Sequence, residues 1–247
     1  MWSDPTPGGG LELGLKASFG VRREELIVKD VPKHIVADGR TNYDRWVLAR
    51  ADAIAAGSEA SVTFDTVQRW SAVAEHALPA AADANGVDII AVPVAPEAVD
   101  RRGGAVFGVL VHAILSEAPF DATRQALEKI AGMEARVLGL TEEDTAAAVA
   151  TVERVLRHDL LVRAANASTR GACRRETPVT LTLPDGTLVE GIVDLAFEEH
   201  GAWVVVDYKT DRELDSGETT YRRQVALYAA AIATATGRAA KGILVRV

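Results

Sequence analysis

The sequence predicts an α/β protein in which helices flank a mixed central sheet that contains an antiparallel β-meander. Three observations support this fold class. Apolar residues recur at helical spacing between residues 106 and 159. Short segments rich in Val, Ile, Phe and Trp, separated by turn residues, follow up to residue 209. An alanine-rich helical stretch and an apolar closing strand then complete the pattern.

An irregular, partly helical segment is expected to precede this arrangement. Pro5, Pro7 and three successive glycines mark the first residues as connecting structure. The expected elements are helices at 41–56 and 66–78, ended by Gly57 and Pro79, a short strand at 62–64 and a linker at 79–104. We therefore expect two parts, residues 1–100 and residues 101–247.

The second part is expected to form the sheet. Its helices have an apolar stripe, and its strands are bounded by turns such as the one at Pro184-Asp185-Gly186. In chain order, we expect helices at 106–117, 122–133 and 141–159, strands at 176–183, 188–197 and 203–208, a helix at 221–234 and a strand at 242–247.

The composition indicates a soluble protein with a substantial core, since 48% of the residues are hydrophobic. The single cysteine, Cys173, excludes an internal disulfide and a four-cysteine zinc or iron–sulfur site. No apolar run approaches the roughly 18 residues of a membrane span, and the N-terminus lacks a signal-peptide pattern. We therefore expect a cytoplasmic protein without a membrane partner.

The formal net charge of −8 argues against a uniformly basic surface for nucleic acid. Phosphate contacts nevertheless need only a local basic patch. Arginines are grouped at several places: Arg101-Arg102, Arg170, Arg174-Arg175, Arg212 and Arg222-Arg223. They either form a basic rim around a site or are scattered, solvated side chains.

The segment GIVDLAFEEHGAWVVVDYKTD carries the strongest functional signal. If His200-Gly201 is the centre of a hairpin turn, Asp194 lies opposite Asp207, with Cβ atoms about 5 Å apart. Two carboxylates this close repel each other unless a cation compensates. Lys209 shares a face with Asp207 because strand side chains alternate. The hairpin thus outlines a metal-dependent hydrolytic site, unless both acids are surface residues.

These residue types suit phosphodiester hydrolysis. A divalent cation neutralises the non-bridging oxygens and lowers the pKa of water, and Mg²⁺ prefers carboxylate oxygens as ligands. The ammonium of Lys209 can orient the attacking water or stabilise developing charge. The alternative for Lys209 is a strand-end lysine paired with Asp207.

Four other residues are candidates. His112 lies in an apolar helix, where an imidazole either binds a metal or its water or is a satisfied core histidine. Glu176 begins the meander as a further carboxylate or as a surface residue. Gln224 and Tyr228 share one helix face because they are four positions apart. They either contact the nucleic-acid backbone and order the lysine, or form an ordinary polar edge.

The order of these elements resembles the PD-(D/E)XK nuclease superfamily, and more narrowly the C-terminal nuclease domain of RecB/AddA-type helicase–nucleases. The matching elements are His112 after RGGAVFGVLV, Glu176, GIVD with Asp194, DYK with Asp207 and Lys209, and QVALY with Gln224 and Tyr228. They cover about residues 101–247. The fragments SFGVRREELIV and YDRW are similar to the segment that joins the helicase core to the nuclease.

The resemblance implies a restriction-endonuclease-like fold and a Mg²⁺- or Mn²⁺-dependent deoxyribonuclease of the exonuclease type. Its substrate would be single-stranded DNA or duplex ends during recombination and repair. It also implies that His112, Asp194, Asp207 and the Tyr208 carbonyl bind the metal and that Lys209 assists the water. In that scheme Gln224 and Tyr228 support the site, and Glu176 is a possible additional carboxylate.

The sequence lacks a GxxxxGK[ST] phosphate loop, so the chain is either a stand-alone relative or the tail of a longer helicase–nuclease, and a helicase motor is a possible partner in cis or in trans. An alternative function is a non-catalytic DNA-binding or scaffolding module of a helicase–nuclease assembly. A serine or cysteine hydrolase has little support, because there is no GxSxG elbow and Cys173 has no evident histidine partner.

Overall fold

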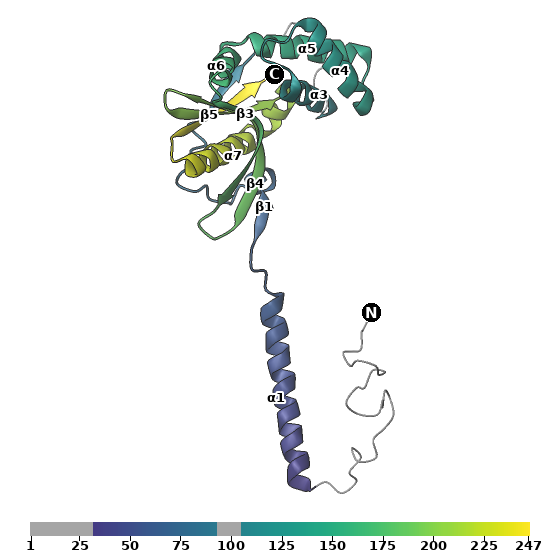
Figure 1. Cartoon of the computed structure of the whole chain (residues 1–247), viewed down its shortest axis with the longest axis vertical. Helices are drawn as coiled ribbons and strands as arrows, with labels where there is room; N and C mark the ends of the chain where they lie inside the picture. Colours follow the sequence, from purple (N-terminus) through teal and green to yellow (C-terminus); the bar gives the residue numbers. More distant parts are fainter. Residues whose placement is uncertain (1–31, 93–104) are drawn as a thin grey trace, which may run out of the picture. The chain divides into compact units, whose positions relative to one another are not determined.

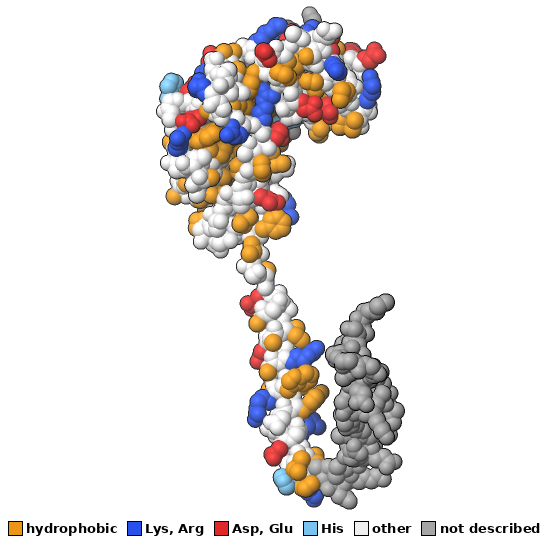
Figure 2. Space-filling view, in the orientation of Figure 1, with side chains coloured by type: hydrophobic (Ala, Val, Ile, Leu, Met, Phe, Trp, Pro, Cys, Tyr) orange, Lys and Arg blue, Asp and Glu red, His pale blue; other side chains and the backbone are white. Residues whose placement is uncertain are grey.

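A computed structural model describes residues 32–92 and 105–247. The chain divides into two compact units, Met1–Ser61 and Val62–Val247. In the first unit, helix α1 (Lys33–Ser58) has no buried residue, and large apolar side chains such as Tyr43 and Trp46 are exposed on it (Figure 2). The predicted helix at 41–56 is thus confirmed. It begins earlier than expected because Gly39 does not interrupt it.

The second unit is built on a mixed six-stranded sheet (Figure 1). The strand order is β1-β4-β5-β6-β2, and β3 pairs with the other edge of β4. β3, β4 and β5 are antiparallel neighbours, whereas the pairs β1–β4, β5–β6 and β2–β6 are parallel. The strands are β1 (Phe64–Thr66), β2 (Asp88–Ala91), β3 (Cys173–Thr182), β4 (Leu188–Glu199), β5 (Ala202–Lys209) and β6 (Ala240–Arg246). The predicted fold class is confirmed.

Helices cover both faces of this sheet. Four of them, with Phe197, Val206 and Ile243 of the sheet, enclose one core, and the other two pack with Val205 and Leu244 on the opposite face. The first group comprises α3 (Ala105–Glu117), α4 (Arg124–Leu138), α5 (Glu142–Arg157) and α6 (Asp159–Ser168), and the second comprises α2 (Val67–Ala72) and α7 (Asp211–Thr236). The β4–β5 hairpin therefore lies between two apolar layers.

Several predicted elements differ from the structure. The helix expected at 221–234 is α7, which begins already at Asp211. The helix expected at 66–78 ends at Ala72, because Val73 adopts an extended conformation. The helix expected at 141–159 is two helices, since His158 is extended and its Nδ1 caps the N–H of Leu160 at the start of α6. The linker expected at 79–104 contains β2, which is defined by its pairing with β6.

The predicted hairpin turn is confirmed. His200 and Gly201 have φ angles of 52° and 81°, the two positive values that a tight type I′ hairpin turn requires. Paired residues then run from Glu199–Ala202 to Leu195–Val206, which is the register expected from that turn centre. Continued by one step, this register would place Asp194 opposite Asp207, but the regular β4–β5 pairing stops at Leu195–Val206.

In the described ranges, no helix is both long enough and apolar enough to cross a membrane. β1 and β2 belong to the same sheet as the later strands, although both precede residue 100. The assignment of residues 1–100 as a segment connecting a helicase to a nuclease stays a prediction.

Candidate active site

The candidate site lies where β3 and β4 depart from regular alternation. Val193 packs in the core with α7, whereas Leu195, two positions later, packs in the core with α3. Residues two apart on a regular strand share a face, so β4 changes faces at Asp194. Opposite this point, Glu176 of β3 has a φ of +45°, in the left-handed region that residues other than glycine seldom adopt.

Asp194 bridges three elements from this irregular position. Its Oδ2 accepts a hydrogen bond from the backbone N–H of Tyr208 on β5 at 2.8 Å. The same oxygen lies 3.5 Å from Nδ1 of His112 on α3. The carboxylate thus takes up a backbone donor just beyond the last β4–β5 pair and connects it with the imidazole.

Asp207 and Lys209 form a buried ion pair on β5. Their side chains are 2% and 11% exposed, and Asp207 Oδ2 lies 2.6 Å from Lys209 Nζ. The predicted common face of these two residues is therefore confirmed. Lys209 Nζ also donates to the Tyr208 carbonyl at 3.2 Å and lies 5.1 Å from the ring centroid of Tyr221. These contacts hold a full positive charge at the site.

The imidazole of His112 faces the same carbonyl. His112 Nε2 lies 2.7 Å from the Tyr208 oxygen, and because a carbonyl can only accept, Nε2 carries the proton in this arrangement. The rings of His112 and Tyr208 also meet edge to face, with centroids 5.9 Å apart. Two nitrogen donors, one from His112 and one from Lys209, therefore converge on one backbone oxygen.

Gln224 and Tyr228 of α7 close the site from the opposite face of the sheet. Gln224 Nε2 donates to the Tyr228 hydroxyl at 3.1 Å and lies 3.5 Å from Asp207 Oδ1. The predicted common helix face is therefore confirmed. Among the described residues, the Oε1 atom of Gln224 is buried and has no hydrogen-bond partner.

Two carboxyl groups have raised pKa values. Burial raises the pKa of Asp194 well above its ordinary value, and the charge of Asp207 raises it further, while Lys209 opposes this shift. Neighbouring side chains partly desolvate the Glu176 carboxyl and so raise its pKa, although His112 opposes the shift. Glu176 is an exposed residue at the edge of this charge cluster. A cation entering the site would relieve the repulsion between these acids.

The donor atoms fit a hard divalent cation after a small adjustment. Among the described residues, no three side chains of His, Cys, Asp or Glu already form a closed metal cluster. His112 Nε2 and the Tyr208 oxygen share a hydrogen bond and lie 2.7 Å apart. Two neighbouring ligand atoms, each about 2.1 Å from a Mg²⁺ ion, would be about 3 Å apart. If that proton moved to Nδ1, which faces Asp194 Oδ2, and the two atoms separated slightly, Nε2 and the Tyr208 oxygen could both face a cation.

The structure adds residues that the sequence did not single out. A Cβ on Gly191 would lie 2.6 Å from the Tyr228 ring, so glycine is required for Tyr228 to reach the site. Tyr221 lies about one helical turn before Gln224, and its ring contacts the Lys209 ammonium. This three-residue spacing is the signal by which the sequence could have identified it.

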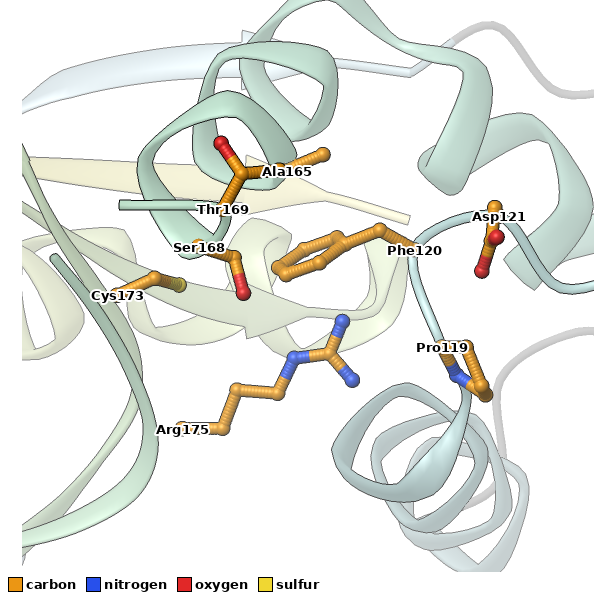
Figure 3. A pocket seen from close by; sticks show the side chains of 8 residues that line it. All are labelled: Pro119, Phe120, Asp121, Ala165, Ser168, Thr169, Cys173 and Arg175. Atoms are coloured by element: carbon orange, nitrogen blue, oxygen red, sulfur yellow. The ribbon is translucent and has the colours of Figure 1, made fainter. Parts of the chain in front are cut away.

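Arg175, which the sequence suggested only as part of a basic rim, packs against other elements of the protein. Its Nη1 donates to the carbonyls of Leu115 and Ala118 at the end of α3, and its guanidinium stacks 3.9 Å from the Phe120 ring centroid. Figure 3 shows this stack at the wall of a hollow of about 670 Å³ that Cys173 also lines. Arg175 thus fastens the helix that carries His112 to β3.

The grouped arginines bind protein carbonyls where they are described. Arg170 and Arg174 donate to neighbouring backbone oxygens, Arg222 to Val87, and Arg223 to Ser71, Val73 and His76. Arg101 and Arg102, and the side chain of Arg212, lie outside the described residues. Burial raises the pKa of the Cys173 thiol, which disfavours the thiolate that a cysteine hydrolase needs.

Known proteins are similar in sequence to parts of this chain. An ATP-dependent helicase/nuclease subunit from Lysinibacillus sphaericus (strain C3-41) is 31% identical over 119 residues, which is 45% of this chain and 9% of that protein. The protein of the same name from Desulforudis audaxviator (strain MP104C) is 29% identical over 175 residues, 61% of this chain and 14% of that protein. The chain thus spans a small part of the curated relatives it matches.

The family comparison covers the sheet and its helices. The model of the PD-(D/E)XK nuclease superfamily matches residues 86–247, a range that contains His112, the β4–β5 hairpin and α7. These are the elements whose side chains meet at the break in the sheet. The chain belongs to the PD-(D/E)XK nuclease superfamily.

Proposed function

We propose that this protein is a divalent-metal-dependent deoxyribonuclease that hydrolyses DNA phosphodiester bonds, as an exonuclease in the recombination and repair of DNA ends. One observation carries the proposal. The buried pair of Asp207 and Lys209 lies beside Asp194 and His112 at the point where regular β4–β5 pairing stops. Such a costly group of buried charges is typical of a functional site.

In this proposal, His112, Asp194, Asp207 and the Tyr208 carbonyl would hold Mg²⁺ or Mn²⁺. A bound cation would neutralise the non-bridging phosphate oxygens and lower the pKa of the attacking water. Three of the donors are oxygens, the ligand type that Mg²⁺ and Mn²⁺ favour. Glu176 is a further carboxylate at the rim, with a raised pKa that suits it to accept or release a proton.

The remaining residues orient the reactants. The ammonium of Lys209 is fixed by Asp207 and the Tyr208 carbonyl, so it can direct a hydrogen bond at the attacking water or at charge developing on phosphorus. Gln224 contacts Tyr228 and lies near Asp207, which keeps that carboxylate in place. Each of these roles depends on a position fixed by β5 or α7.

The curated relatives, which carry helicase and nuclease in their names, support DNA as the substrate and a helicase motor as a partner, in cis or in trans. Single strands or duplex ends are the substrates that such a motor would supply. A role of this kind implies a cytoplasmic protein.

The test is incubation of the full chain with labelled single-stranded and duplex DNA in Mg²⁺, Mn²⁺ or EDTA. We expect cleavage with either metal, none in EDTA, and none for Asp207→Ala or Lys209→Ala, with circular dichroism verifying the fold of each variant. Full metal-dependent activity in both variants would refute the proposal. Salt-sensitive DNA binding without cleavage in either metal would instead indicate the non-catalytic scaffolding module.

A further inference from the structure

A second hollow adjoins the candidate site along β4. β4 pairs with β1 up to Glu190 and with β5 from Leu195, while residues 191–193 pair with β3 alone. A hollow of about 560 Å³ opens at this gap and is lined by residues of β1, α2, β3, β4 and α7. Its size lies in the range of ligand pockets. Tyr228 belongs both to its lining and to the candidate site.

The lining is apolar with a few polar groups. Pro178, Val179 and Ile192 form apolar wall, and Ile192 is 54% exposed although it is a branched apolar residue. Gln68 supplies an amide that can both donate and accept. Of the described residues that line the hollow, only Glu190 is charged, and its charge would repel a phosphate.

We propose that this hollow binds one unpaired nucleobase of the DNA strand that is cut. The inference rests on the proposed nuclease function and extends it to the form of the substrate. A base offers a flat apolar surface and polar edges, which match the walls and Gln68, whereas the backbone phosphate would lie toward the ammonium of the neighbouring Lys209. A base that is paired and stacked in a duplex cannot enter, so the hollow selects single strands.

Binding of DNA to the full chain in EDTA tests this without cleavage. The probes are a short fluorescent oligothymidylate and the same strand with abasic residues, compared by fluorescence anisotropy. We expect the base-containing strand to bind about tenfold more tightly, as for burial of roughly 55 Å² of apolar surface. Ile192→Trp, which fills the hollow with a side chain, should reduce this preference to near unity.

Val137→Trp on α4 is the matched control, because Val137 is 82% exposed and lies away from this hollow. It should keep the tenfold preference. Equal binding of both strands by the wild type, no binding of either, or an unchanged preference in Ile192→Trp would overturn the inference. A change of oligomeric state in Ile192→Trp with no change in DNA binding would also overturn it and identify the gap as a protein contact.

Cleavage assays with the same preparations separate the two proposals. Cleavage in Mg²⁺ or Mn²⁺ without any preference for bases would leave the nuclease proposal intact and refute the base-binding hollow. A preference for the base-containing strand without cleavage in either metal would support the base-binding hollow and refute the nuclease proposal.

Discussion

The two ends of the β4–β5 hairpin use the same two strands in opposite ways. At the turn end, pairing is regular from Glu199–Ala202 to Leu195–Val206, and apolar side chains point into the cores. At the other end the ladder stops, and the Asp194 carboxylate replaces a strand partner for the Tyr208 N–H. Regular pairing fixes the position of the hairpin, and the break brings together the polar side chains that chemistry needs.

The difference also has an energetic side. The turn end buries Phe197 and Val204, which stabilises the fold. The site end buries Asp207 and Lys209, and removing such charges from water costs free energy that their attraction only partly offsets. We therefore expect substitutions at the turn end to change stability alone, and those at the site end to change function as well.

Lys209→Met is the substitution expected to have the largest effect. It keeps the length of the side chain but removes the ammonium, so we expect DNA cleavage to fall by about 10²–10⁴-fold, the usual contribution of such a group. The exposed Lys241→Met on β6 is the control and should retain full rates. Single-turnover cleavage measures both. Equal losses in the two variants would show that the ammonium beside Asp207 has no special role.

Gly191→Ala should disturb the site end through packing. The added Cβ would lie 2.6 Å from the Tyr228 ring, so the ring must move, and we expect a loss of about 1–3 kcal/mol in the free energy of unfolding together with slower cleavage. Gly132→Ala on α4 meets nothing within 4 Å and should instead stabilise the protein slightly. Thermal unfolding should show a lower Tm for Gly191→Ala and a slightly higher Tm for Gly132→Ala, each relative to the wild type.

Gly201→Ala is the counterpart at the turn end. Gly201 has a φ of +81°, where a Cβ costs about 1–2 kcal/mol. We expect urea unfolding to show this loss of stability, while cleavage rates below the unfolding transition stay as in the wild type. A selective loss of cleavage would mean that the turn is coupled to the site.

Asp194→Asn should cause the smallest change in stability, and in the opposite direction. Because burial raises the pKa of Asp194 in the folded state, ionising this carboxyl costs stability as the pH rises above its ordinary pKa of about 3.9. The variant should therefore match the wild type at lower pH and be more stable at neutral pH, by on the order of 1 kcal/mol. Asparagine can still accept from the Tyr208 N–H.

Mg²⁺ provides the second measurement on this variant. Mg²⁺ should raise the Tm of the wild type at neutral pH, because the bound cation would compensate the buried negative charge of Asp194. It should leave the Tm of Asp194→Asn nearly unchanged, because that charge is absent. A metal-dependent Tm shift of the same size in both proteins would remove Asp194 from the proposed ligands.

Much of the hairpin was readable from the sequence because its signals are local. Alternating apolar residues and the His200-Gly201 turn predicted the register, and spacing alone predicted the common face of Asp207 with Lys209. The strand β2 and the helix break at His158 were missed. The strand β2 depends on pairing with β6, far along the chain. The helix break depends on a histidine side chain that caps the next helix, and no Gly or Pro marks it in the sequence.

The sequence by itself determined the order of the elements, the hairpin register and the residue types that suit a cation and a phosphodiester. These follow from periodicity and from side-chain chemistry, which need only neighbours along the chain. Only the tertiary structure decided that β4 changes faces at Asp194, that His112 meets the Tyr208 carbonyl, and that Gly191 makes room for Tyr228. Each of these depends on packing between elements distant in sequence, where a shift of an ångström decides whether two groups meet.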